Sequence, residues 1–171
     1  MIDWEAAFDE AEPQSPLAKD ALERELAQLS APLDDAELKE LTERVGNANA
    51  LRTENPVAKN GFPADLLSFY RWADGGTFSV GDRHFDPLLA MQEIREYMIS
   101  YGVIHFLPGC IPIGMDGGGC FYLLDLGARP EPTVYFGGMN ELDSPDAVKP
   151  LALSLRDLFT DKRDPVRVTG L

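Results

Sequence analysis

Apolar residues recur every three or four positions along three stretches of the first 46 residues, which is the spacing of one buried helix face. These stretches predict helices over residues 3–11, 16–30 and 34–45. Pro13 separates the first two, because proline cannot continue a helix. Asp34 and Glu37 have the spacing of a capping box, and Gly46 suits the position just past a helix end. The amino-terminal part is therefore predicted to be helical.

The rest of the chain alternates between helical spacing and short apolar runs. Further helices are predicted over residues 63–73, 89–101 and about 151–159. Pro63 suits a first helical turn, and Asp74-Gly75-Gly76 suits a helix end, because glycine adopts a positive φ at no steric cost. Residues 47–62 are rich in turn-forming Asn, Pro and Gly and predict a loop, while residues 161–171 predict a loosely held tail.

Short apolar or aromatic runs between glycines and prolines are typical of strands. Such runs predict strands over Thr77–Val80, Arg83–Phe85, Val103–Leu107, Cys110–Gly114, Cys120–Asp125 and Thr133–Phe136. Gly81-Asp82 and Gly117-Gly118-Gly119 have the turn chemistry of hairpins. Amino-terminal helices thus precede a mostly antiparallel sheet, with no strand–helix–strand alternation. The sequence predicts an α+β fold with a strongly twisted sheet packed with helices.

The chain is strongly acidic, with a net charge of −14 and a pI near 4.4. Residues 1–46 hold 13 acidic and 4 basic side chains, so the amino-terminal third is predicted to carry the strongest negative surface. Such a field repels nucleic-acid phosphates and anionic membranes and attracts cationic partners. Alternatively, these charges are only the solvated faces of amphipathic helices. Neither interpretation favours a nucleic acid or a membrane as partner.

A length of 171 residues fits one domain spanning 1–171. The first residues lack a basic leader, and no later run reaches the roughly 18 apolar residues of a membrane span. The two cysteines, Cys110 and Cys120, are too few for a disulfide framework or a multi-cysteine zinc site and predict reduced structural thiols. We therefore expect a cytoplasmic protein. A monomer or a weak homodimer is predicted without a specific sequence signal for either.

The sequence contains no recognisable catalytic motif. The glycine cluster at residues 114–119 lacks a lysine and precedes a predicted strand, which favours a hairpin turn over a phosphate-binding loop. His84 lies between Asp82 and Asp86 and could form a cation site, although such residues at a turn are more often solvated. His105 is predicted to be a satisfied sheet histidine. We predict no catalysis, no cofactor and no metal; the alternative is a small enzyme or ligand carrier.

Three blocks of the chain resemble the SUKH superfamily. They are residues 62–76 (FPADLLSFYRWADGG), 111–125 and 133–136 (TVYF). The SUKH pattern has a helix that begins at a hydrophobic-Pro pair and ends in an Asn-Gly-Gly turn. It continues with a strand-turn-strand containing Asp and glycines, and with a Val-Tyr strand before a closing helix, to which residues 153–159 are similar. The resemblance covers residues 60–160 and leaves residues 1–46 as an acidic helical extension. It departs from the pattern at Asp74, where Asn is frequent, and at Cys120, where a small polar residue is common.

The resemblance implies a protein-binding function. Bacterial SUKH members are largely immunity proteins that neutralise secreted or contact-dependent toxins, and fungal members regulate cell-wall synthesis through protein contacts. Many of these toxins are nucleases or other nucleic-acid-modifying enzymes with basic active-site surfaces, onto which an acidic inhibitor could be steered, although the family also includes inhibitors of other toxins. We therefore predict an immunity protein whose partner is a cognate toxin domain, such as a basic nuclease. A regulatory scaffold of the fungal type is the alternative.

The predicted partner-binding residues are acids near the predicted turns together with aromatic side chains that could act as hot spots. They are Asp74, Asp82, Asp86, Asp116, Trp72 and Tyr122. For Trp72, packing in the core is favoured over contact with a partner, because it falls just off the buried face of its predicted helix.

Overall fold

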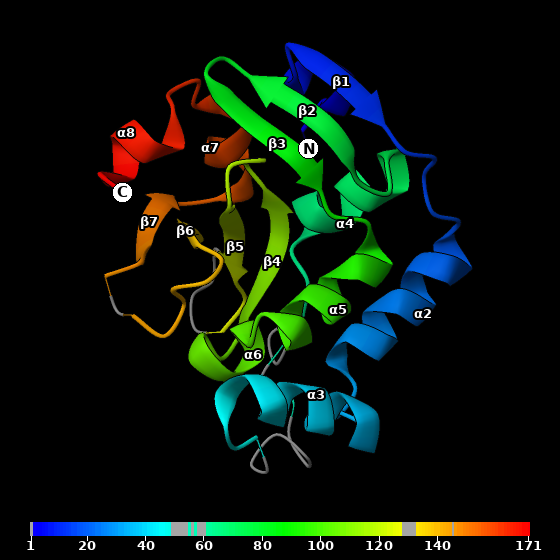
Figure 1. Ribbon diagram of the computed structural model, residues 1–171. Coiled ribbons are helices and arrows are strands. Elements are labelled where there is room, and N and C mark those ends of the chain that lie inside the picture. Colours follow the sequence, from blue (N-terminus) through cyan, green and yellow to red (C-terminus); the bar gives the residue numbers. More distant parts are fainter. Residues whose placement is uncertain (1, 49–54, 56, 58–60, 128–132, 145) are drawn as a thin grey trace.

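The computed structural model describes residues 2–48, 55, 57, 61–127, 133–144 and 146–171. These residues form an antiparallel seven-stranded sheet with helices packed against it, which confirms the predicted α+β class (Figure 1). Each strand is hydrogen-bonded to the next one along the chain, so the spatial order follows the sequence from β1 to β7.

Most of the sheet comes from the second half of the chain. The strands are β1 (Glu10–Pro13), β2 (Gly76–Val80), β3 (Arg83–Leu88), β4 (Cys110–Met115), β5 (Cys120–Asp125), β6 (Val134–Gly138) and β7 (Val148–Ala152). The two predicted hairpins are confirmed as β2–β3 and β4–β5. The strand β1 pairs with β2 across the longest stretch of intervening sequence, so the amino-terminal extension is part of the sheet.

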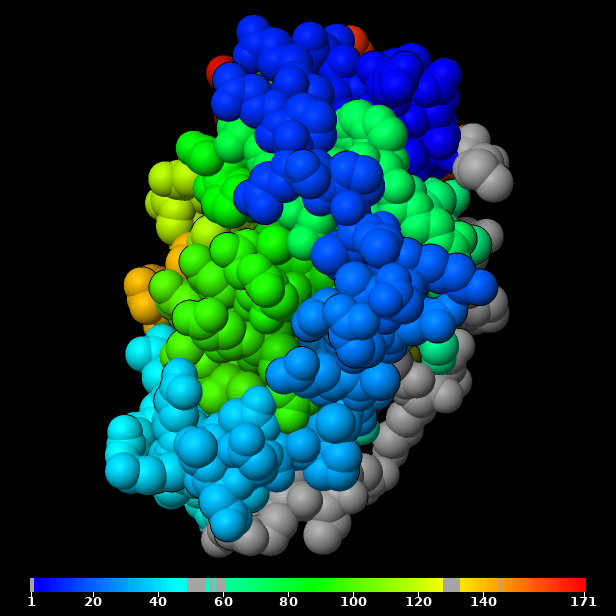
Figure 2. Space-filling view, turned by 90° about the vertical axis from the view of Figure 1, so that its right-hand side faces the viewer, coloured from blue at the N-terminus to red at the C-terminus, as the bar shows by residue number. Residues whose placement is uncertain are grey.

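Helices cover the sheet from several directions. They are α1 (Trp4–Ala7), α2 (Lys19–Ser30), α3 (Asp35–Val45), α4 (Ala64–Trp72), α5 (Met91–Ser100), α6 (Val103–Phe106), α7 (Leu155–Thr160) and α8 (Pro165–Thr169). Both α2 and α3 contact α5, and Figure 2 shows these three helices together on one face of the molecule. In the described ranges, none combines the length and apolar character needed to cross a bilayer.

The start of α3 has the predicted capping box. The Asp34 carboxylate accepts hydrogen bonds from the backbone N–H groups of Ala36 and Glu37, at 2.8 and 2.9 Å. The Glu37 carboxylate accepts in return from the Asp34 N–H at 2.8 Å. These bonds satisfy donors that a helix start leaves unpaired, so the local sequence alone was sufficient to place this end of α3.

Arg95 on α5 ties α2 and α3 to the rest of the molecule. Its guanidinium forms a bidentate pair with Glu37, with N–O distances of 2.6 and 2.8 Å. It also donates to the backbone carbonyls of Ala31 and Pro32, at 3.1 and 3.0 Å, in the α2–α3 connection. The pairing with Arg95 lowers the pKa of the Glu37 carboxyl. One buried cation thus fixes the end of α2 and the start of α3.

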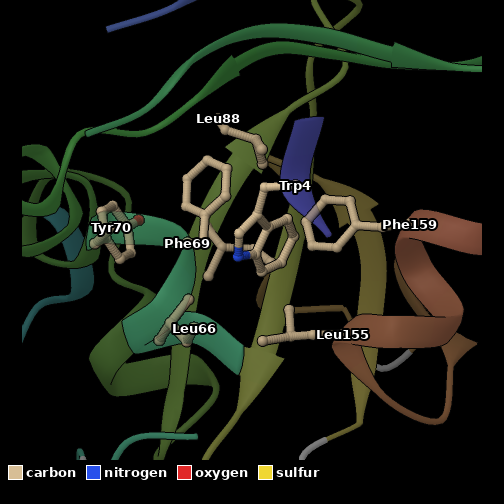
Figure 3. Close-up of a pocket in the computed structure, with 8 residues that line it drawn as sticks. Trp4, Leu66, Phe69, Tyr70, Leu88, Leu155 and Phe159 are labelled. Carbon is tan, nitrogen blue, oxygen red and sulfur yellow. The ribbon is translucent and has the colours of Figure 1, made fainter. Parts of the chain in front are cut away.

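The core on the helix-covered side of β2–β3 is an aromatic cluster centred on Trp4. The indole lies between Phe69 of α4 and Phe159 of α7, with ring centroids 5.2 and 5.3 Å away, as Figure 3 shows. Its Nε1 donates to the Ser68 hydroxyl at 3.0 Å. The cavity beside these rings measures only about 10 Å³, so Trp4 fills this space almost completely. The amino-terminal segment is therefore anchored in the core.

The predicted helix over residues 3–11 is only half correct. The helix α1 stops at Ala7, and residues 10–13 form β1 instead. Phe8 leaves the helix and packs its ring against Phe78, with centroids 4.5 Å apart. Gly76 lets β1 approach, since its φ is +131° and a Cβ there would lie 2.4 Å from the Glu12 carbonyl oxygen. Tertiary pairing with β2 overrides the local helical spacing.

The predicted strand over residues 103–107 is wrong, because these residues form α6. Gly102 adopts a left-handed φ of +71°, and the Leu107 N–H closes a helical turn onto the Val103 carbonyl at 2.8 Å. The turn buries Val103 and Ile104 together, whereas a strand would place them on opposite faces. His105 is exposed on this helix and is not a sheet histidine.

The carboxy-terminal region also differs from the prediction. Residues 148–152 form β7, and the predicted helix over 151–159 begins only after Ser154, whose hydroxyl accepts from the Asp157 N–H at 3.1 Å. The expected loose tail contains α8 and is held by the buried Arg83, which donates to the Arg163 carbonyl at 3.3 Å. Most of the predicted loop over 47–62 lies outside the described residues.

Candidate functional site

The β2–β3 hairpin has one buried face and one polar face, because successive strand residues point to opposite sides. The side chains that point into the core are Phe78, Val80, Arg83 and Phe85. The side chains on the opposite, outer face are Thr77, Ser79, His84 and Asp86. The same alternation that builds the core therefore presents a polar row to the outside.

The strand β1 extends this outer face by two carboxylates. Glu10 lies opposite Ser79, which lies opposite His84 on the other side, so three strands contribute to one row. Glu12 lies opposite Thr77 in the next row. Side chains directly opposite each other in an antiparallel pair are within about 4.5–5.5 Å at Cβ, close enough to act on one ligand.

Contacts just before the start of β1 keep these carboxylates in place. The Asp9 carboxylate accepts from the Gly81 N–H in the β2–β3 turn at 2.7 Å and pairs with Lys162 at 2.9 Å. These two partners lower the pKa of the Asp9 carboxyl, with the hydrogen bond from Lys162 as the larger cause. The start of β1, the hairpin turn and the carboxy-terminal segment are thus joined at one point.

The β4–β5 turn supplies a further carboxylate. Asp116 forms a parallel bridge with Asp86, which brings this turn alongside β3. One oxygen of its carboxylate accepts from the N–H groups of Gly118 and Cys120, at 2.8 and 2.9 Å, and so shapes the turn. Asp116 therefore has both a structural contact and a position at the outer face.

Together these elements form a concave surface that we call the acidic groove. It has a volume of about 340 Å³ and is lined by Glu10, Ala11, Glu12, Thr77, Phe78, Ser79, His84, Asp86, Asp116 and Gly117. Four of these described residues are carboxylates, and none is Lys or Arg. Such a surface attracts a cationic group and repels phosphate. In the described part of the chain, no group of three or more His, Cys, Asp or Glu is arranged to hold a metal ion.

Two of the predicted binding acids, Asp86 and Asp116, meet in the acidic groove. Asp82 does not line it. This residue is exposed in the β2–β3 turn, where its N–H donates to the Lys162 carbonyl at 2.9 Å. Asp82 lies in the turn of the hairpin, whereas Asp86 lies on β3 and lines the groove.

Asp74 is separated from the groove as well. Its carboxylate is half-buried and accepts from the Met91 N–H at the start of α5, at 2.8 Å. Burial raises the pKa of this carboxyl, and the nearby Glu93 adds to the increase. The geometry gives Asp74 a helix-capping contact.

Of the two predicted aromatic hot spots, Tyr122 lies in the core and Trp72 packs against it. Tyr122 was predicted as a hot spot, a role that requires an exposed ring, but its side chain is 0% exposed and its hydroxyl donates to the His84 carbonyl at 2.8 Å. A strand with apolar residues on both faces does not reveal which side chains remain outside. Trp72 is half-buried and stacks on Phe8, with centroids 5.9 Å apart, in agreement with the favoured core packing.

Sequence reasoning missed Glu10, Glu12 and Ser79 as residues of the site. The alternation of charged and small residues in Glu10-Ala11-Glu12 was the available signal, but it is too short to distinguish a strand from a helix. Ser79 carried no signal at all, because its importance comes from its place between β1 and β3.

The enzyme alternative requires a histidine that converges with a nucleophile. Ser79 lies opposite His84 across β2–β3, but no hydrogen bond joins the two side chains. Cys110 lines a different hollow beside α6, and burial raises the pKa of its thiol to about 12, which leaves it protonated near neutral pH. The described residues therefore offer no assembled nucleophile and base.

The sequence profile of the SMI1/KNR4 family (SUKH-1) matches residues 32–161, which is most of the chain. The chain belongs to this family. Membership places the SUKH-1 chain among protein-binding modules of the immunity and regulator type. A search of curated protein sequences finds no match to it. The matched range includes Ser79, His84, Asp86 and Asp116 and leaves out α1, β1 and α2, so Glu10 and Glu12 come from outside the family range.

Proposed function

We propose that this SUKH-1 chain is an immunity protein that binds a cognate bacterial toxin domain directly and blocks its active surface. The acidic groove supports the proposal more than any other feature. Four carboxylates from three parts of the chain face one hollow in which the described lining residues include no Lys or Arg. The contacts of Asp9 hold β1, which carries two of them, in position before any partner arrives.

Electrostatics explains why such a surface suits a toxin that acts on nucleic acid. An enzyme that binds phosphates presents basic side chains on its surface. The carboxylates of the groove have the opposite charge and can pair with those side chains. The net charge of −14 adds a long-range attraction that speeds the encounter. Occupying the basic surface would exclude the nucleic acid, because both ligands compete for the same cations.

The test requires a search of the neighbouring genes for a toxin, whose isolated carboxy-terminal domain is then used. The full chain is expected to form a stoichiometric complex in light scattering and to restore growth of a bacterial host that expresses the domain. Replacing two groove residues, as in Glu12→Lys with Asp86→Lys, should weaken the complex by more than about tenfold, since two attractive contacts become repulsive.

The matched control is Glu40→Lys with Glu43→Lys on α3, which makes the same change of charge on exposed residues at the opposite end of the molecule (Figure 1). This control should change the equilibrium constant by less than about twofold at physiological salt, where distant charges are screened. If the control weakens the complex as much as the groove variant, the groove is not the contact surface. If no toxin domain is bound, the regulatory scaffold becomes the better assignment.

A further inference from the structure

Ser79 is an uncharged polar residue of the acidic groove, so attraction between opposite charges does not describe what its hydroxyl could bind. Its side chain lies on the groove floor, on the outer face of β2, and is only 7% exposed. The structure gives its hydroxyl no hydrogen-bond partner among the described residues, although Ser68, Ser100 and Ser154 all have one. The hydroxyl oxygen is not among the fully buried atoms that lack a partner, so it reaches the groove and can accept a hydrogen bond from a ligand without displacing a protein donor.

The surroundings of this hydroxyl restrict the chemistry of the ligand. Glu10 flanks Ser79 on one side and His84 on the other, and Glu12 and Asp86 belong to the next row. The ligand therefore meets several acceptors at different angles within a short distance. A flat group with several N–H donors can bond to more than one of them at once, whereas a single point charge cannot reach them equally well.

The size of the groove suits one side chain of a partner. Ala11 and Phe78 line it as well, but the Phe78 side chain points into the core and Ala11 lies opposite it on that same face. A hollow of about 340 Å³ accommodates a side chain rather than a folded element.

We infer that the acidic groove is an arginine receptor: a guanidinium of the partner protein donates to the Ser79 hydroxyl and to the carboxylates of β1 and β3. This inference rests on the proposed function, in which the groove is the contact surface, and adds the side chain that the groove selects. Arginine fits because its guanidinium has five donors in a fixed plane, while the lysine ammonium has three on a flexible stem.

The strand β1 makes this receptor a property of the present chain. Glu10 and Glu12 lie outside the range that matches the SUKH-1 family, and β1 stands at the edge of the sheet. Without β1, Ser79 would lose one flanking row and the groove would lose two of its four carboxylates. The amino-terminal extension thus supplies selectivity for arginine and adds it to the part of the sheet that matches the family.

The test titrates the full chain, labelled with ¹⁵N, with three short peptides that differ in one side chain: acetyl-Gly-Arg-Gly-amide and its lysine and citrulline counterparts. Citrulline has the shape of arginine without the charge. The arginine peptide should shift the amide signals of β1, β2 and β3 and bind at least about tenfold more tightly than the citrulline peptide. The lysine peptide should bind about threefold more weakly than the arginine peptide.

Two variants separate a built receptor from general attraction. Ser79→Ala removes only the hydroxyl and should abolish the preference for arginine over lysine. Glu12→Gln should weaken both cationic peptides by about threefold to tenfold, whereas Glu40→Gln on α3 removes the same charge elsewhere and should leave binding unchanged. Retained chemical-shift dispersion in each variant shows that it is folded.

Equal affinities for arginine and citrulline, or shifts spread over α2 and α3 instead of the groove, would overturn the inference. An unchanged arginine preference in Ser79→Ala would do so too. The two proposals can fail separately. A toxin complex that depends on Glu12 and Asp86, with no arginine preference in the peptides, rejects only the arginine receptor. A clear arginine preference without any toxin complex rejects the immunity function and leaves the selectivity of the groove.

Discussion

The two faces of the β2–β3 hairpin are built from alternate residues of the same strands, but one packs in the core and the other lines the acidic groove. The inner face carries Phe78 and Phe85, which pack into the aromatic cluster around Trp4. The outer face carries Ser79, His84 and Asp86, which line the acidic groove. Because each residue contributes to only one face, stability and recognition can vary independently in this part of the molecule.

The central strands do not show this division. On β4 and β5 the residues opposite the main core are also buried, in a second apolar cluster that includes Phe121 and Leu123. The β1–β3 part of the sheet, by contrast, leaves a polar outer face. The comparison teaches that a sheet becomes a binding platform where one face lacks cover, and that its buried face then determines how rigid the platform is.

The largest expected effect is on the inner face. Phe85 is 0% exposed and its ring contacts those of Tyr122 and Phe159, so Phe85→Ala should lower the free energy of unfolding by about 3–5 kcal/mol. Chemical denaturation followed by circular dichroism measures the change. The neighbouring outer-face variant His84→Ala should cost less than about 0.5 kcal/mol. Equal losses for the two variants would show that the faces are not separate.

The second prediction concerns the hydrogen bonds that Arg95 donates to Glu37 and to the α2–α3 connection. Arg95→Met keeps the stem of the side chain but leaves Glu37 and several carbonyls without their donor, so we expect a loss of about 2–3 kcal/mol. The double variant Arg95→Met with Glu37→Gln should recover part of this loss, because no unpaired charge is then left. The parent chain, the single variants Arg95→Met and Glu37→Gln and the double variant form a double-mutant cycle. The measurement is the denaturation midpoint of each. Simple additivity would mean that the pair does not act as a unit.

The third prediction follows from the lowered pKa of Glu37. Its carboxyl ordinarily titrates near 4.5 and is held below that value by Arg95. A carboxyl with a lower pKa in the folded state stabilises the fold above its unfolded pKa, and this stabilisation disappears as the pH falls through the folded value. The pKa of Asp161 is lowered to about 2, mainly by the hydrogen bond from Arg163, so this carboxyl changes the stability with pH in the same direction.

Stability should therefore decrease as the pH falls from about 4.5 toward 2, and less steeply in Arg95→Met than in the parent chain. Thermal melting at several pH values measures the slopes. Asp74 contributes in the opposite direction, because its raised pKa favours the protonated form in the folded state. Parallel slopes for parent and variant would contradict the role of the Arg95–Glu37 pair.

The smallest effect on stability is expected in the acidic groove. Glu12→Gln removes one of four neighbouring negative charges, so the free energy of unfolding should change by less than about 0.5 kcal/mol or increase slightly. The same change should weaken binding of the cationic peptides. Comparing denaturation with the peptide titration on one sample checks both statements. A large loss of stability would place Glu12 in the fold rather than in recognition.

Several elements were predictable because their signals are local. The capping box at Asp34 and Glu37, the helix after Pro63 and the hairpin at Gly81-Asp82 depend on residues close in sequence, and all are present. The family resemblance also rested on contiguous blocks, and the family match confirms it. By contrast, the acidic groove was only partly foreseen. Asp86 and Asp116 were chosen for their predicted turns, while Glu10, Glu12 and Ser79 were not chosen.

The amino-acid pattern by itself determined the fold class, the approximate ends of α3, α4 and α5, the two hairpins and the strong negative charge, because each depends on neighbouring residues or on composition. Only the tertiary structure decided that residues 10–13 are a strand, that Tyr122 is buried and that Ser79 lies between carboxylates from two strands. The physical reason is that pairing energy between β1 and β2 is gained only when distant segments meet, and no local spacing records which segments those are.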